Sequence, residues 1–395
     1  MTPLERRASA SLASIFALRM LGLFLVLPVF ALEARKYPGG DDPALLGLAM
    51  GIYGLTQGFL QLPFGMASDR FGRKRVIVLG LVIFALGSFW AAAATDLTGL
   101  LLGRSLQGAG AVSAAVTALL ADLTRDEVRT KAMALVGASI GLMFALSLVV
   151  APLLAGAIGL SGLFGLTGVL ALLGVAVVVW GAPAAPPLAA AKARGSLKVV
   201  LSHAGLLRLN LGVFVLHAVQ LAMWVAVPAM LVQVGLPKEA HWQVYLPAVL
   251  GSFVLMGGMF AMERRGHLKK VFLSAIALIA LVQLGLLVQS WGTSSLWALA
   301  GLLFAFFCGF NVLEASQPSL ASRLAPPEVR GTAMGVYNTL QSLGFFTGGW
   351  LGGWLVKNYG SPALFLGCAA AMLVWLVVAW PMQTPGRVAV AQAAP

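Results

Sequence analysis

The chain has 395 residues, of which 60% are hydrophobic and only 10% are charged, and its formal net charge is +13. A water-soluble protein of this length carries a far larger charged fraction, so the composition excludes an ordinary soluble fold and predicts a chain surrounded mostly by lipid. The positive charge does not indicate nucleic-acid binding, because the 26 Lys and Arg residues cluster in alternate short loops rather than on one face.

Long apolar runs recur along the chain, and about twenty such residues cross a bilayer as one helix. They predict an all-α membrane protein of twelve transmembrane helices, arranged as two six-helix bundles related by pseudo-two-fold symmetry. The proline- and alanine-rich stretch 182–206 is expected to be a cytoplasmic linker between bundles 1–181 and 207–383, and residues 384–395 a cytoplasmic tail. The expected spans are 9–33, 44–66, 75–95, 97–121, 132–154, 160–181, 207–234, 242–262, 270–290, 294–321, 331–354 and 361–381.

The basic residues predict the orientation of these spans. Two of them, Arg19 and Arg104, fall inside spans. Of the other Lys and Arg residues, twenty fall in loops or termini on one side, and four fall on the other, namely Arg35, Lys36, Lys238 and Lys357. Because cytoplasmic loops of membrane proteins are enriched in Lys and Arg, the basic side, with both termini, is expected to face the cytoplasm.

The loop between the second and third spans, Gly65 to Arg75, reads GMASDRFGRKR. The preference for basic residues in cytoplasmic loops explains the final three, but it does not explain an acid and two glycines at fixed spacing. Gly72 permits a turn that other residues would strain, and Asp69 can meet the positive N-terminal end of a neighbouring helix. The sequence Glu263-Arg264-Arg265-Gly266 follows the eighth span in the same way, which indicates an internal repeat typical of secondary transporters.

This loop closely resembles motif A of the major facilitator superfamily. Nearly all of residues 10–383 is similar to one bacterial inner-membrane branch of that superfamily, in the stretches RMLGLFLVLPVF, GIYGLTQG, DLTRDEVRTKAMA and GTAMGVYNTLQSLG. The resemblance implies a proton-driven, drug-efflux-like transporter in a bacterial inner membrane, acting by alternating access and without a cofactor. Members of the branch also carry a soluble C-terminal domain, for which the tail expected here is too short.

The resemblance also implies a cytoplasmic gate that locks the outward-open state. In the superfamily the residue at Asp69 meets the N-terminus of the eleventh helix, and the residue at Arg73 pairs with an acid at the end of the fourth helix, here Asp122. The gate residues implied by motif A are Gly65, Asp69, Arg70, Gly72, Arg73 and Asp122.

Two arginines inside spans are further candidates. A buried arginine costs at least about 2.5 to 3.5 kcal/mol unless it is paired or hydrated, which makes Arg104 in the fourth span a functional candidate. With Gln107 it resembles the superfamily's motif B, which is associated with proton coupling. The alternatives are a structural ion pair for Arg104 and, for Arg19 in the first span, a side chain that snorkels to the membrane surface.

Glu314 is the only acid deep in the second half, in the tenth span. A lone buried carboxylate is suited to carry a proton near neutral pH, so Glu314 is predicted as the proton or substrate-charge site. Asn311 and Gln317 lie three residues to either side and are expected on the same helix face. The alternative is a neutral acid that is hydrogen-bonded between helices.

The substrate cavity is expected between the two bundles, at the first, fourth, seventh and tenth spans. His217, Gln220 and Trp224 lie one turn apart on the seventh span, although a lone membrane histidine is more often a structural hydrogen-bonding group. The residues expected at the cavity are Arg19, Gln107, His217, Gln220, Trp224, Asn311, Asn338 and Gln341.

The predicted function is proton-coupled transport of a small molecule, most simply efflux of amphipathic or hydrophobic compounds by antiport. The fifth span keeps Pro152 and Gly156 of the superfamily's antiporter motif but replaces other glycines with alanine or serine, so antiport is favoured without being fixed. The alternatives are an importer of a nutrient or metal and a membrane sensor that does not transport. The expected partners are lipid, substrate and protons. A monomer is expected, with no enzyme activity, metal site, cofactor or nucleic acid.

Overall fold

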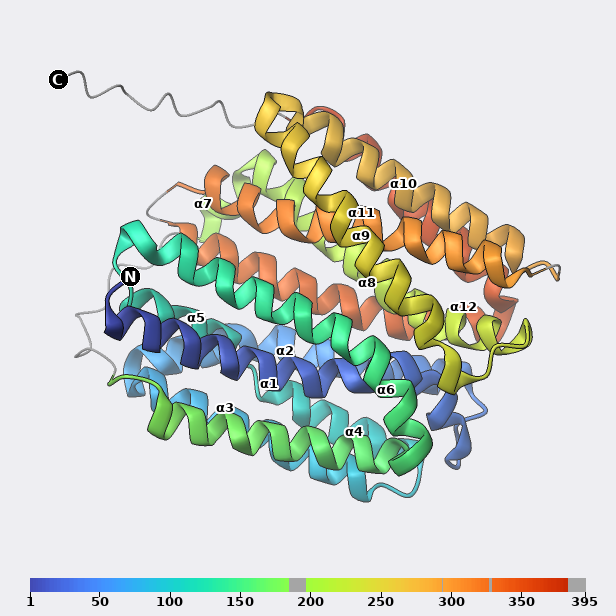
Figure 1. Ribbon diagram of the computed structural model, residues 1–395, viewed down its shortest axis with the longest axis horizontal. Helices are drawn as coiled ribbons and strands as arrows, with labels where there is room; N and C mark the ends of the chain where they lie inside the picture. Colours follow the sequence, from blue (N-terminus) through green and yellow to red (C-terminus); the bar gives the residue numbers. More distant parts are fainter. Residues whose placement is uncertain (185–196, 293, 327–328, 383–395) are drawn as a thin grey trace.

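The computed structural model describes residues 1–184, 197–292, 294–326 and 329–382. Long helices run side by side through these ranges, which contain no strand (Figure 1). The middle of the predicted linker and the predicted tail lie outside the described residues. The helices are α1 (Pro3–Glu33), α2 (Pro43–Phe71), α3 (Arg73–Ala93), α4 (Leu97–Ala109), α5 (Ser113–Asp122), α6 (Asp126–Ala176), α7 (Leu197–Ser202), α8 (Ala204–Gln233), α9 (Trp242–Met262), α10 (Leu268–Gln289), α11 (Leu296–Leu324) and α12 (Arg330–Ala379), with short segments η1 (Ala34–Lys36), η2 (Val177–Gly181), η3 (Lys238–Ala240) and η4 (Glu263–His267).

These helices make twelve crossings in the described part of the chain. Eight helical segments are long and apolar enough to span a membrane. Two of them, which contain α6 and α12, cross twice because each leaves helical geometry at one glycine, Gly159 or Gly360. The remaining two crossings are α9 and the α4–α5 pair, so the predicted all-α fold of twelve spans is confirmed. The expected break between the fifth and sixth spans falls at Gly159.

The fourth span differs from the prediction of one unbroken helix over 97–121. Gly110 has φ −76° and ψ 52°, and it separates α4 from α5. A Cβ atom added to Gly110 would lie 2.4 Å from the carbonyl oxygen of Gly80 in α3, so the chain approaches α3 here as only a glycine can. The break places Ser113 in the first turn of α5.

Glycines with positive φ occur at corresponding places in the two halves. They lie in the loops between the first two spans, the second and third, and the fifth and sixth of each half. Positive φ costs glycine little, so matched glycines mark matched turns. They support the repeat that the sequence indicated at Gly72 and Gly266. The three pairs are Gly39 and Gly235, Gly72 and Gly266, and Gly159 and Gly360.

The molecule has two chemically different ends. We call the one with the N-terminus, the turn at Gly72 and the starts of α6, α8 and α12 the basic end, and it lies at the left in Figure 1. The opposite end contains the turns at Gly39, Gly159, Gly235 and Gly360. Every predicted site residue lies either between these ends or at the basic end.

The two halves meet most closely where α2 packs against the first part of α12. A Cβ atom added to Gly47 would lie 2.2 Å from the carbonyl oxygen of Gly349, and one at Gly54 would lie 2.4 Å from that of Ser342. Glycines therefore allow backbone-to-backbone contact from the opposite end to the middle of α2. Nearer the basic end the contact loosens to side chains, with Leu62 beside Gly335.

The buried apolar core is also shared between the halves away from the basic end and separate for each half at the basic end. One large cluster includes residues of both halves, among them Phe30, Phe144 and Phe307. The ring centroids of Phe144 in α6 and Phe307 in α11 are 6.0 Å apart, which joins the halves near mid-height. At the basic end, by contrast, a cluster around Ile77 belongs to the first half alone and one around Leu206 to the second half alone.

Candidate functional site

The motif A loop forms a polar cluster at the basic end of the first half. Gly72 has φ 99° and ends α2, so Arg73 at the start of α3 turns back over the last turn of α2. Arg73 donates from Nε to Asp122 Oδ2 at 3.0 Å and from Nη1 to Ser68 Oγ at 2.8 Å, and it is also paired with Asp69. The Arg73–Asp122 pair that the resemblance implied is therefore present, while its role as a gate stays a prediction.

Asp69 has a different neighbour from the one the superfamily pattern implied. Its carboxylate is paired with Arg73 of its own half, and no hydrogen bond joins it to a described residue of α12. Half of the Asp69 side chain is exposed. This arrangement fits a conformation in which the two halves are apart at the basic end.

Arg19 is buried and does not snorkel. Its Nη1 donates to Ser113 Oγ at 3.0 Å and its Nη2 to the hydroxyl of Tyr53 at 2.7 Å, while the guanidinium lies 5.5 Å from the ring centroid of Phe84. Ser113 can accept this hydrogen bond because the break at Gly110 places it in the first turn of α5. Arg19 thus ties α1 to α2 and α5, with neutral partners among the described residues.

Arg104 is also held by neutral groups. It donates to the carbonyl oxygens of Ala49 at 3.3 Å and Met50 at 3.0 Å in α2, and to Gln107 Oε1 at 3.3 Å. Gln107 in turn donates to Ser88 Oγ at 2.8 Å. This network links α4 to α2 and α3, and it does not bring Arg104 to Glu314.

The second half contains a cluster of three titratable or polar side chains from three helices, His217 of α8, Glu314 of α11 and Gln341 of α12. His217 Nδ1 lies 2.8 Å from the carbonyl oxygen of Val213, so that nitrogen carries a hydrogen and donates it. The other ring nitrogen, Nε2, lies 3.1 Å from Glu314 Oε2. Gln341 Nε2 lies 2.8 Å from His217 Nε2 and donates to Glu314 Oε1 at 3.4 Å.

Exposure distinguishes the members of this cluster. The side chain of His217 is 2% exposed, whereas that of Glu314 is 40% exposed. Phe310 and Phe345 cover His217 with edge contacts, at ring distances of 6.0 and 4.8 Å. Water or a substrate can therefore reach part of the Glu314 side chain, whereas its Oε2 atom is buried against His217.

The neighbours of Glu314 on α11 do not share its surroundings. Asn311 donates to Ser252 Oγ of α9 at 2.8 Å, and Gln317 is fully buried beside Gly212 of α8. The expectation of one common face was wrong because three residues turn a helix by about 300°, so positions six apart differ by roughly 120°.

Three other residues expected at the cavity are placed as follows. Trp224 is buried in the core, 5.4 Å from the ring of Tyr245, and Gln220 is buried one turn before it. Asn338 is half-buried on α12, where its carbonyl accepts a hydrogen bond from Ser342. Their contact with substrate stays a prediction.

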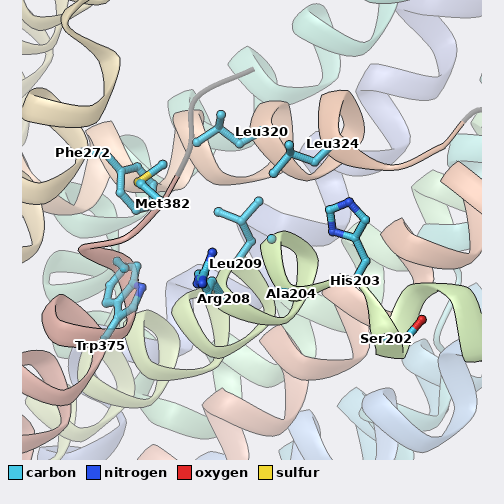
Figure 2. Close-up of a pocket in the computed structure, with 12 residues that line it drawn as sticks. Ser202, His203, Ala204, Arg208, Leu209, Phe272, Leu320, Leu324, Trp375 and Met382 are labelled. Carbon is cyan, nitrogen blue, oxygen red and sulfur yellow. The ribbon is translucent and has the colours of Figure 1, made fainter. Parts of the chain in front are cut away.

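A cavity of 440 Å³ opens in the second half at the basic end (Figure 2). Arg208 and His203 of the α8 region lie on one side of it, with Phe272, Trp375 and Met382 on another. The predicted site residues are not among the described residues that line it. It is therefore separate from the cluster around Glu314.

Sequence reasoning missed the groups that hold the buried arginines and the acids at the opposite end. Tyr53 accepts a hydrogen bond from Arg19, and its ring centroid lies 5.4 Å from the Arg104 guanidinium. Its hydroxyl within an apolar span was the available signal. Glu33 and Asp42 were also missed, although acids next to the rare basic residues of that side could have drawn attention to them.

Comparison with known proteins places the fold in a family. The model of the Major Facilitator Superfamily matches residues 12–349, and the chain belongs to this superfamily of membrane transporters. It is a multi-pass transport protein and not an enzyme.

The individual relatives agree with this assignment. The chain is 42% identical over 391 residues to the inner membrane transport protein YajR of Escherichia coli, covering 98% of this chain and 85% of that protein. This confirms the branch that the four resembling stretches predicted. The tetracycline resistance protein of class B from Escherichia coli is 33% identical over 141 residues, covering 35% of this chain and 34% of that protein. A crystal structure of a D-xylose–proton symporter matches with a TM-score of 0.76 at 15% identity, covering 95% of this chain and 98% of that one.

Proposed function

We propose that the protein is a proton-coupled secondary transporter that expels amphipathic or hydrophobic compounds by alternating access, and that Glu314 carries the proton. The observation that carries the proposal is the contact between exposed Glu314 and buried His217. A carboxylate that water can reach, backed by an imidazole that water cannot, is suited to take up and release a proton as the cavity changes sides.

The geometry of the cluster requires one proton between these two groups. Because Nδ1 of His217 donates to Val213, Nε2 is the nitrogen that faces Glu314 Oε2. Two lone pairs at 3.1 Å would repel, so the hydrogen is either on the carboxyl, which donates to the ring, or on the ring, which donates to the carboxylate. When the ring is neutral, the single lone pair of Nε2 is shared between the carboxyl and the Gln341 amide, which also donates to Glu314 Oε1. When the ring is charged, that amide has to turn its oxygen to Nε2 or move away.

The charges around Glu314 favour a cationic or neutral substrate. The buried arginines Arg19 and Arg104 are 1% and 2% exposed, while the side chain of Glu314 is 40% exposed. Aromatic rings such as Phe310 and Phe345 surround the cluster and offer apolar contact. A hydrophobic cation that competes with the proton for Glu314 would give exchange, which is antiport.

The proposed orientation rests on the charges of the loops. Twenty basic residues fall on the side of the basic end and four on the other, which supports a cytoplasmic basic end with both termini inside the cell. With this orientation, the close packing of the halves at the opposite end and their separation at the basic end correspond to an inward-facing conformation.

The test is transport in proteoliposomes with an imposed pH gradient, using ethidium as a hydrophobic cation and a panel of neutral dyes for comparison. Glu314→Gln is expected to abolish the dependence of transport on the pH gradient, because glutamine keeps the shape but takes up no proton. Asp41→Asn, which neutralises an exposed acid of the α1–α2 loop, is the matched control and is expected to retain it.

Unchanged gradient-driven transport in Glu314→Gln would contradict the proposal. Movement of protons with the dye, rather than against it, would replace the antiporter by an importer while leaving the role of Glu314 intact.

A further inference from the structure

Two ion pairs join the halves at the end opposite the basic end. Lys238 of η3, in the second half, is paired with Glu33 at the end of α1. Lys357, near the end of the first part of α12, donates to Asp42 Oδ2 at 2.7 Å. The other oxygen of Asp42 caps α2 by accepting from the backbone N–H of Ala44 at 2.9 Å. We call these two pairs the clasp.

Each pair of the clasp joins one half to the other. Both acids come from the first half and both lysines from the second. Lys238 and Lys357 are also the only Lys or Arg residues that the sequence of the second half places on this side. Few basic residues are expected on this side. Both of the lysines that the second half places there form ion pairs with the first half.

The two pairs differ in burial and therefore in strength. The Glu33 side chain is only 3% exposed, and Lys238 is 21% exposed. Asp42 and Lys357 are 36% and 47% exposed, so water and salt screen that pair. Removing Lys238 leaves the buried Glu33 carboxylate with Lys36 as its one remaining described cation, whereas the same carboxylate is hydrated once the halves separate. Loss of Lys238 should therefore disfavour the closed conformation specifically.

We infer that the clasp is the outer gate of the transporter and that both pairs break when this end opens. The inference deepens the proposed alternating access and rests on it. Glu33, Asp42, Lys238 and Lys357 then set how often the opposite end opens, although none of them contacts the cluster around Glu314. The gate residues of motif A would act at the basic end in the other half of the cycle.

The chain supplies its own matched control for Lys238. Lys36 also donates to Glu33, at 2.8 Å, but it belongs to the same half as Glu33. Lys36→Gln and Lys238→Gln remove the same charge from the same carboxylate. Only the second removes a contact between halves, although Lys36 is the more exposed of the two, at 61% against 21%. Opening of this end in Lys238→Gln but not in Lys36→Gln therefore reports the contact between halves.

The test measures the distance between spin labels on cysteines introduced at Asp41 and Asn358, exposed residues beside the Asp42–Lys357 pair. The two native cysteines, Cys308 and Cys368, are buried and are replaced by serine. In detergent and in liposomes, the variant Lys238→Gln with Lys357→Gln is expected to raise the population with long distances by about fivefold or more, the usual range of coupling between sites. Lys36→Gln is expected to leave the distribution unchanged.

A charge exchange keeps the test valid if the double variant folds poorly. Glu33→Lys with Lys238→Glu restores the pair in reverse and is expected to return the short distance. The inference is overturned if removal of both lysines leaves the distances unchanged, or if Lys36→Gln opens this end equally. The measurement needs no substrate and no proton gradient, so it separates failure of the clasp from failure of the proposed transport activity.

Discussion

The two ends of the interface between the halves hold their charges in different ways. At the basic end, Arg73 is paired with Asp69 and Asp122, and Arg125 with Glu5, and each of these pairs lies within the first half. At the opposite end, Lys238 and Lys357 reach across to acids of the other half. The backbone contacts between α2 and α12 tighten toward the same end.

This difference shows which contacts report the conformation. Ion pairs within one half move as a rigid unit and survive when the halves rock, so they do not oppose the motion. Pairs and close backbone contacts across the interface must break for the opposite end to open, and they therefore determine the population of the closed state.

The largest expected effect is at the glycine contact that makes the opposite end so tight. Gly47→Ala would place a Cβ atom 2.2 Å from the carbonyl oxygen of Gly349. Overpacking of this kind costs about 1–3 kcal/mol, and here it falls on the closed conformation, because the contact is absent once the halves separate. The distance between labels at Asp41 and Asn358 is expected to lengthen in most molecules.

The control for Gly47 is Gly301→Ala in α11, where an added Cβ atom meets no heavy atom within 4 Å. It should leave both the label distance and the thermal stability near those of the parent. If Gly47→Ala and Gly301→Ala gave the same distances, the tight contact would not be what holds this end closed.

A substitution at the basic end is expected to have a smaller effect on the population of the present conformation, and to raise that population rather than lower it. Asp69→Asn removes a half-exposed pair with Arg73, which keeps Asp122 and Ser68 as partners, so the conformation described here loses little. The conformation closed at the basic end would lose the contact of a carboxylate with the start of α12, about 0.3–1 kcal/mol. Asp69→Asn should therefore favour the present conformation and slow transport while folded protein remains in the membrane.

The measurement is transport rate together with label distance in the same preparation. A slower rate with short distances at the opposite end supports the gate role of Asp69. Full transport activity in the variant would remove that role from the loop.

The fold could be predicted from sequence because a chain that crosses lipid has to satisfy its backbone hydrogen bonds within each helix. A run of apolar residues such as 75–95 has one stable form in a membrane, and the basic loops between runs fix the count. Gly72 and Gly266 could be identified because each lies three residues after an acid, in a short loop where the turn requires glycine. The break at Gly110 was not, since it depends on the close approach of Gly80 from another helix.

The site could be predicted only in part for a related reason. Glu314 stands out as a lone acid in an apolar span, but its partners His217 and Gln341 are distant in sequence, and which of several polar groups meets it depends on helix rotation. Glu33 and Lys238 carry no motif at all. Each is ordinary for a loop next to a membrane, and only the packing of the halves brings them together.

The smallest expected effect is that of pH on the clasp and on the label distance beside it. Its hydrogen bond with Lys357 keeps the pKa of Asp42 below the ordinary 3.8. Partial burial alone would lower the pKa of Lys238, but its hydrogen bond and attraction to Glu33 outweigh this and leave the pKa above the ordinary 10.5. The contribution of Asp42 is present above its ordinary pKa and lost as pH falls through the lowered value. That of Lys238 is present below its ordinary pKa and lost as pH rises through the raised value.

Between pH 5 and 8 Asp42 and Lys238 therefore keep their charges. The other titratable groups near Glu33 and Lys238 are Lys36, Tyr37 and Glu239. The label distance at the opposite end should stay constant over this range in Glu314→Gln. Transport by the parent protein should change over the same range, because the proton site proposed for it is the pair of Glu314 and His217. A label distance that changes with pH in the Glu314→Gln variant would place a proton-sensing group in the clasp itself, and would then make the outer gate, rather than the cavity, the point where the gradient acts.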